Sequence, residues 1–220
     1  PHWTWIKGDG GLTATSIMLA QFPRQWASGE VISAEAFKTM TSPTVLNDGI
    51  ETGYGIGVRN GEFLGEKIIG HTGGHKSTYS IMVFFPERDI TIVCFMNTDN
   101  TPVNIRNVFV KFASIVLEKE IPNYKDQEVP ANNLLLFEGT YRNFDYKMEN
   151  AISIQLNDNH LYYCMGDDCL KMYHLGEHKF WIERWPYDFV SFHVDEKGQV
   201  LAMKEYYSGY YSVLRKKIRS

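Results

Sequence analysis

The stretch that decides the fold is residues 67–96, which read KIIGHTGGHKSTYSIMVFFPERDITIVCFM. Its apolar and β-branched runs, separated by glycine-rich or charged residues, are typical of strands joined by short turns. With one further run upstream, the predicted strands cover residues 54–59, 67–71, 78–85 and 90–96. A turn is predicted at Asn60-Gly61. This series predicts an antiparallel meander.

Helices are predicted on both sides of these strands in the sequence. Apolar spacing predicts a helix over residues 12–26, with Thr15 as its capping residue. A second predicted helix begins at Ser33 and ends before Pro43, and a third covers residues 103–117. Because the last two strands are apolar on both faces, layers must cover both sides of the sheet. The third helix is long enough to be one of them.

The composition changes near residue 120. A polar stretch with two prolines at residues 119–130 has the chemistry of a linker, and most aromatic residues follow it. Clean apolar-polar alternation, as in residues 152–157, and turn signals about every 10 residues are typical of a small antiparallel barrel. We therefore predict an α+β fold: a first unit at residues 1–121, a linker at 122–133 and a barrel of about eight strands at 134–220.

Charge and hydropathy exclude two classes of partner. The 220 residues carry a formal net charge of −4, which lacks the basic excess that nucleic-acid binding needs. The longest apolar runs fall far short of the roughly 20 residues that span a bilayer. The chain opens with Pro1 and has no recognisable signal peptide, so we expect a piece of a longer protein.

Three cysteines are too few for a disulfide framework. Cys94, inside an apolar run, is interpreted as a small buried hydrophobe. Cys164 and Cys169 flank a predicted turn and could face each other as a disulfide; whether they pair depends on the strand register, so both states stay open. His174 and His178 lie nearby but without a zinc-binding frame, and no metal or cofactor is expected.

Candidate chemistry is concentrated in Gly70-His71-Thr72-Gly73-Gly74, at the end of one predicted strand. An imidazole, a hydroxyl and glycines at a strand end offer a polarising group, a hydrogen-bond partner and a backbone that a substrate can approach closely. Exposed N–H groups of such a strand can stabilise an oxyanion. The alternative is structural: the glycines turn the chain and His71 packs.

Several short motifs occur in a fixed order. They are GDGGLTAT at residues 8–15, YGIG at 54–57, GHTGG at 70–74, SIMVFFPE at 80–87 and ITIV at 90–93. Together they resemble the C-terminal half of the serine β-lactamase and penicillin-binding-protein superfamily, in the branch of class C β-lactamases, D-aminopeptidases and esterases. The resemblance covers residues 8–117.

This resemblance implies roles for four residues. His71-Thr72-Gly73 would be the family's third motif, usually Lys-Thr-Gly. His71 would then assist proton transfer or orient the substrate, Thr72 and Gly73 would bind the substrate through its carboxylate or carbonyl, and Gly74 would supply an oxyanion-hole N–H. With His in place of Lys, peptidase or esterase chemistry is at least as expected as β-lactam hydrolysis.

The family's nucleophile is missing from the chain. It lies in Ser-x-x-Lys, and no serine here has a lysine three residues later. Tyr141-Arg142-Asn143 matches the second motif formally, but we interpret Gly139-Thr140-Tyr141 as the first barrel strand. The chain alone is therefore expected to be inactive. Half a sheet should leave residues 81–85 uncovered, which predicts dimerisation or association with a missing N-terminal half.

Two functions remain at this point. The first is a fragment of a serine hydrolase that cleaves an amide or ester, in a D-amino-acid peptide, a β-lactam or a small ester, through an acyl-enzyme on a serine outside this chain. The second is a non-catalytic binding protein whose lipocalin-like barrel holds a peptide or apolar ligand with its aromatic residues, including Trp181, Trp185, Tyr206 and Tyr207. By resemblance, the location would be the bacterial envelope or the exterior.

Overall fold

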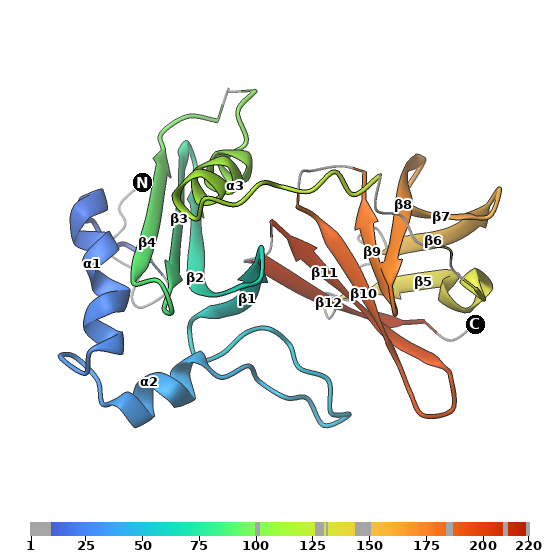
Figure 1. Cartoon of the computed structure of the whole chain (residues 1–220), viewed down its shortest axis with the longest axis horizontal. Helices are drawn as coiled ribbons and strands as arrows, with labels where there is room; N and C mark the ends of the chain where they lie inside the picture. The colour runs from blue at the N-terminus through green and yellow to red at the C-terminus, as the bar shows by residue number, and fades with distance from the viewer. Residues whose placement is uncertain are drawn as a thin grey trace.

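The computed structural model describes residues 10–99, 102–125, 130, 132–143, 151–183, 187–208 and 211–218. These residues form a four-stranded antiparallel sheet in the order β1-β2-β3-β4 and a closed barrel in the order β10-β11-β12-β5-β6-β7-β8-β9 (Figure 1). The predicted α+β class and the eight-stranded barrel are confirmed. The exact domain boundaries stay a prediction, and Gly8, Asp9 and Trp185 lie outside the described residues.

The elements have the following bounds. The helices are α1 (Ser16–Ala27), α2 (Ala34–Thr41), α3 (Ile105–Val116) and the 3-10 helix η1 (Leu134–Phe137). The sheet strands are β1 (Arg59–Phe63), β2 (Glu66–His75), β3 (Thr78–Phe85) and β4 (Ile90–Met96). The barrel strands are β5 (Gly139–Arg142), β6 (Ile152–Asn157), β7 (His160–Met165), β8 (Asp168–Gly176), β9 (Lys179–Ile182), β10 (Phe189–Val194), β11 (Val200–Tyr207) and β12 (Tyr211–Lys217).

Side-chain caps start the three α-helices. Thr15 accepts a hydrogen bond from the Met18 N–H at 3.2 Å, so α1 begins after Thr15 and the predicted start at residue 12 is wrong. Ser33 accepts one from the Ala36 N–H at 3.1 Å, and Asn104 caps α3 in the same way. None of the helices in the described ranges is long and apolar enough to cross a membrane.

The first hairpin differs from the prediction. Asn60 and Gly61 lie inside β1, opposite Ile69 and Ile68, and the turn is formed instead by Leu64-Gly65. Both turn residues have positive φ, 49° and 79°, as a two-residue hairpin turn of the primed type requires. The predicted strand at residues 54–59 and the predicted turn at Asn60-Gly61 are therefore wrong.

Both faces of the sheet are covered. Phe109, Val110 and Ala113 of α3 pack in one core with Ile81, Val83 and Phe85 of β3. Figure 1 shows α1 on the opposite side of the sheet from α3, next to β4 and β3. Residues 81–85 are consequently buried, and the expectation that they are uncovered is wrong.

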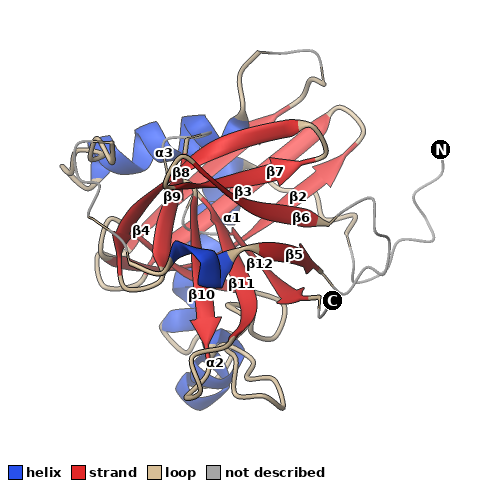
Figure 2. Cartoon of the chain, turned by 90° about the vertical axis from the view of Figure 1, so that its right-hand side faces the viewer, coloured by secondary structure: helices blue, strands red, loops and turns tan. Residues whose placement is uncertain are grey.

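The eight strands β5 to β12 close into the barrel that faces the viewer in Figure 2, and a cluster of buried side chains fills its interior. Phe137 of η1 packs against Phe180 and Phe192, with ring centroids 5.3 and 4.6 Å apart. A second part of the interior is polar: Tyr163 donates to Glu205, and the Arg215 Nε lies 2.6 Å from the other Glu205 oxygen. Burial raises the pKa of the Tyr163 phenol. The barrel is therefore a packed body.

The register resolves the state of the hairpin cysteines. Cys164 of β7 lies directly opposite Cys169 of β8, and the two form a disulfide. His174 directs its Nε2 to the Glu177 carbonyl. No group of three metal-ligating side chains lies together in the part of the chain that the structure describes.

Among the described residues, two clusters of buried side chains join the barrel to the part of the chain that carries the sheet. Tyr187 and Phe189 of the barrel share a core with Phe63, Phe109 and Tyr124. The loop at residues 44–52 contributes to the second cluster. Its Ile50 packs against Ala202 and Leu214, its Asp48 pairs with Lys216, and its Glu51 carbonyl accepts from Lys204 at 3.3 Å.

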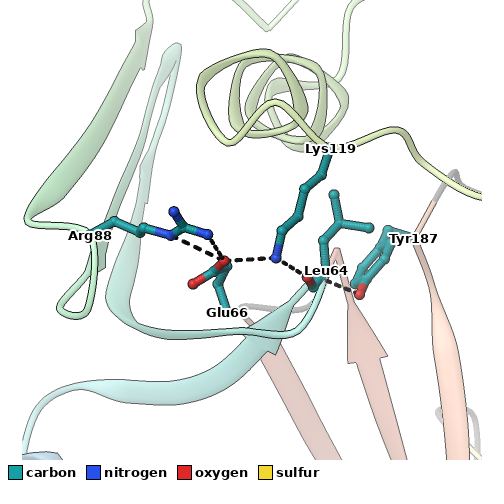
Figure 3. Close-up of polar contacts among 5 residues, drawn as sticks. All are labelled: Leu64, Glu66, Arg88, Lys119 and Tyr187. Atoms are coloured by element: carbon teal, nitrogen blue, oxygen red, sulfur yellow. Dashed lines mark hydrogen bonds and ion pairs between the residues drawn. The ribbon is translucent and has the colours of Figure 1, made fainter.

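A buried carboxylate links these parts (Figure 3). Glu66 Oε1 lies 2.7 Å from both Arg88 Nη2 and Lys119 Nζ, and Lys119 also donates to the Leu64 carbonyl at 2.8 Å. The Leu64 N–H donates to the Tyr187 hydroxyl at 2.7 Å. Hydrogen bonds from Arg88 and then Lys119 lower the pKa of Glu66 to about 2.

This lowered pKa predicts an acid-sensitive contribution to stability. A carboxyl with a folded-state pKa below its ordinary 4.5 stabilises the fold above that pH, and the contribution is lost as the pH falls toward about 2. Glu66→Gln should therefore lower the melting temperature by several degrees at pH 7. The difference from wild type should shrink between about pH 4.5 and 2.

Thermal unfolding monitored by circular dichroism across this pH range measures the effect. Glu196→Gln, at an exposed turn of the barrel, is the matched control and should change little. A Glu66→Gln variant as stable as wild type at pH 7 would contradict the assignment.

Candidate functional site

From His71 onward, the GHTGG motif lies on the part of β2 that pairs with a neighbouring strand on one side only. β1 pairs with β2 only from Glu66 to Gly70. From His71 to His75, β2 pairs with β3 alone among the described residues. The motif is therefore at an open strand edge.

Strand geometry determines which backbone groups face this edge. Two-residue hairpin turns close on a hydrogen-bonded pair, here Phe63 with Glu66, and such pairs alternate along an antiparallel ladder. Residues 66, 68 and 70 thus bond to β1, so Thr72 and Gly74 direct their N–H and C=O groups to the open edge. The Asn60 N–H, bonded to the Gly53 carbonyl at 2.9 Å, faces away from β2 as this alternation requires.

The four candidate side chains divide between the two faces of the sheet. His71 and Gly73 share one face, and Thr72 and Gly74 share the other, which is the face covered by α3. His71 and Thr72 are half-buried, whereas Gly73 and Gly74 are exposed. The roles implied for these residues stay predictions; by the alternation above, the Gly74 N–H points to the open edge.

Tyr54 is a site residue that sequence reasoning missed. Its hydroxyl lies 2.8 Å from Nε2 of His71, and the two rings meet edge to face at 5.8 Å. The YGIG motif contained this tyrosine, but nothing in the sequence indicated its contact with His71. The contact needs the chain to return beside the start of β1, where Tyr54 pairs with Arg59 and the Gly53 carbonyl accepts from the Asn60 N–H.

A second unpredicted group lies at the β2–β3 turn. Asp99 accepts hydrogen bonds from the Ser77 N–H at 2.8 Å and the Ser77 hydroxyl at 2.6 Å. A hydrogen bond to Asp99 also raises the pKa of Tyr79, the residue opposite Gly74. Beside this turn lies a hollow of about 480 Å³ lined by Tyr79, Met96, Asp99, Val103 and Arg106, among others. Its lining residues come from β3, β4, the segment that leads into α3 and the start of α3, and none belongs to β2.

The segment Tyr141-Arg142-Asn143, which formally matches the family's second motif, lies in the barrel. Tyr141 is fully buried in the barrel, where its hydroxyl donates to the Phe137 carbonyl at 2.7 Å. Residues Gly139–Arg142 form β5, which confirms the interpretation of this segment as the first barrel strand.

The glycines of β2 predict contrasting effects of alanine. A Cβ at Gly70 would lie 2.2 Å from the Met82 carbonyl oxygen, a backbone atom that cannot move without disturbing β3. A Cβ at Gly74 would meet nothing nearer than the Tyr79 ring at 3.8 Å. Gly70→Ala should therefore lower the free energy of unfolding by roughly 1–3 kcal/mol, and Gly74→Ala by much less. Urea denaturation measures both, and equal losses would count against this register.

Comparisons with known proteins identify a family for the first half of the chain. The family model for β-lactamases matches residues 1–113. Among curated proteins, none matches this sequence. Two crystal structures, of SurE and of SurE with D-Leu, are similar with a TM-score of 0.51 and 14% identity over 91% of this chain. The octameric penicillin-binding protein homologue from Pyrococcus abyssi gives a TM-score of 0.46 and 17% identity over 96%.

The similar structures are about twice as long. This chain covers 46% and 47% of the two SurE chains and 48% of the Pyrococcus abyssi chain. At these identities the likeness concerns the fold alone. The family match includes β1 to β4 and the GHTGG motif, and it spans just over half of the 220 residues. The chain therefore belongs to the β-lactamase family.

Proposed function

We propose that this chain is the C-terminal part of a serine hydrolase that cleaves an amide or ester through an acyl-enzyme. The observation that carries the proposal is the open edge of β2, where the Thr72 and Gly74 backbone groups lie beside the His71 and Tyr54 side chains. Acyl transfer needs N–H donors for an oxyanion and a group that moves a proton, and this edge offers both.

Each residue has a role in this proposal. The Gly74 N–H stabilises the developing oxyanion, and Thr72 with Gly73 aligns the substrate along the edge. His71 takes part in proton transfer. Because Gly73 and Gly74 are exposed and have no side chain, an extended peptide substrate can approach the backbone of β2 closely. A bulky side chain at these positions would block that approach.

The proposed substrates are D-amino-acid peptides, β-lactams or small esters. One of the similar structures is SurE with D-Leu, which supports a D-amino-acid substrate class. The histidine in place of the family's usual lysine supports peptides and esters over β-lactams.

The nucleophile is proposed to lie outside these 220 residues. Neither a fluorescent penicillin nor a fluorophosphonate probe should add mass to this chain, because none of its serines has the activating lysine. A longer natural product that carries Ser-x-x-Lys should be labelled. Serine-to-alanine substitution in that motif is the control and should abolish labelling. Intact-mass spectrometry reads both experiments, and labelling of the 220-residue chain would overturn the proposal.

The alternative is a non-catalytic binding protein that uses the barrel. The aromatic residues expected to line a ligand cup have other surroundings: Trp181 and Tyr206 pack against the core between barrel and sheet. Phe180 and Phe192 fill the interior. These contacts favour a supporting role for the barrel, so the hydrolase proposal leads.

We also propose that the outer edge of β4 is the surface through which this chain associates with a second copy. By the hydrogen-bond alternation above, Thr91, Val93 and Phe95 direct their backbone groups away from β3. No described strand pairs with that edge. β4 carries neither a charge nor a proline, the devices that protect edge strands.

Sedimentation of the 220-residue chain tests this association. We expect a dimer that Phe95→Lys disrupts, since Phe95 is on β4 and 49% exposed. Ile56→Lys is the matched control, because Ile56 is 67% exposed but lies near Tyr54, away from β4. A monomeric wild type, or a dimer that survives Phe95→Lys, contradicts the proposal.

We propose an envelope or external location for the protein. The Cys164–Cys169 disulfide supports it, because disulfides persist mainly in oxidising compartments. Thiol titration of protein taken directly from its cells tests it: one reactive thiol, that of Cys94, is expected after denaturation, and three would argue for a reducing compartment.

A further inference from the structure

Both ring nitrogens of His71 are engaged. Nδ1 lies 2.6 Å from the Thr72 carbonyl oxygen, and Nε2 lies 2.8 Å from the Tyr54 hydroxyl. A carbonyl oxygen only accepts, so Nδ1 carries the proton. In the neutral ring Nε2 is then an acceptor, and the Tyr54 O–H donates to it.

Tyr54 is held in place for this contact. Its carbonyl accepts from the Thr44 N–H at 2.8 Å and from the Thr52 hydroxyl at 3.2 Å. The Arg59 guanidinium lies 5.0 Å from the centre of its ring. The loop that carries Thr44 and Thr52 is in turn fastened to the barrel through Ile50. Tyr54 is therefore held through its backbone carbonyl and through the face of its ring.

We propose that Tyr54 is the proton carrier of the site and that His71 acts through it. This inference rests on the proposed function. His71 cannot take a proton directly from another group without losing Tyr54, because Nε2 is occupied and Nδ1 faces the backbone. The Tyr54 oxygen, by contrast, keeps lone pairs that can accept a hydrogen bond from a nucleophilic hydroxyl while its own proton points at His71.

The proton balance of the step is simple. As the serine oxygen bonds to the substrate carbonyl carbon, its proton passes to Tyr54 Oη, and the Tyr54 proton passes to Nε2 of His71. The resulting imidazolium keeps its Nδ1–H bond to Thr72. When the bond from carbon to the leaving nitrogen or oxygen breaks, the proton returns from Nε2 through Tyr54 to that atom. Water then repeats the two transfers to release the acyl group.

The tautomer of His71 tests the inference in the chain as it stands. Neutral histidine in water favours the proton on Nε2, whereas this arrangement requires it on Nδ1. Long-range ¹H–¹⁵N correlation spectra of labelled protein at about pH 9 distinguish the two forms. We expect His71 in the Nδ1–H form, with its signals identified by their loss in His71→Gln.

Tyr54→Phe should change the ¹⁵N chemical shift of His71 Nε2, because the phenyl ring keeps the packing but Nε2 loses its hydrogen-bond donor, while the Thr72 carbonyl keeps the proton on Nδ1. Tyr79→Phe is the matched control: Tyr79 lies on the neighbouring strand and bonds to Asp99, so His71 should not respond. An Nε2–H form in the wild type, or no response to Tyr54→Phe, would overturn the relay.

The two proposals fail separately. The tautomer measurement needs neither a nucleophile nor a substrate, so its failure would leave the hydrolase proposal standing. In a longer natural product that is labelled at its serine, Tyr54→Phe should slow labelling by about 100-fold. A product that is never labelled would overturn the hydrolase proposal and leave the tautomer unaffected.

Discussion

The turn at Leu64-Gly65 is the constraint on which the rest of the sheet depends. It sets the register of β1 on β2, and the alternation of bonded pairs then runs through β3 to β4. A slip of one residue would move His71 to the face that α3 covers and turn the Gly74 N–H away from the open edge. Together with the turn between His75 and Thr78, which sets the register of β2 on β3, this turn decides which groups of the site face the open edge.

This turn contains a leucine with positive φ, a conformation that a side chain disfavours. Its surroundings compensate. The Leu64 N–H and C=O are bonded to Tyr187 and Lys119, and Lys119 in turn shares Glu66 with Arg88. The barrel, the end of α3 and the β3–β4 turn therefore all hold the same hairpin. Three donor contacts offset the cost of burying the Glu66 carboxylate.

The sequence predicted those features of the fold that depend on neighbouring residues alone. The caps at Thr15 and Ser33, strands β3 and β4, and the alternating barrel strands follow from capping chemistry and side-chain periodicity. The prediction of a turn at Asn60-Gly61 was wrong, although Asn-Gly is a strong local hairpin signal. Hydrogen bonds between Leu64 and distant residues stabilise the turn at Leu64-Gly65 instead. The motif on β2 could be found in the sequence, but the Tyr54–His71 contact could not. It depends on a loop whose position the barrel determines.

Through the loop at residues 44–52, the barrel helps to position a residue of the candidate site. Its outer end rests on Ala202, Leu214 and Lys216, and its inner end carries the hydrogen bonds that hold Tyr54. A chain built this way cannot exchange its barrel freely for another one. A replacement barrel would have to offer the same contacts to residues 44–52, because otherwise Tyr54 would no longer be held beside His71. Substitutions in this loop and in its barrel contacts are therefore expected to be coupled.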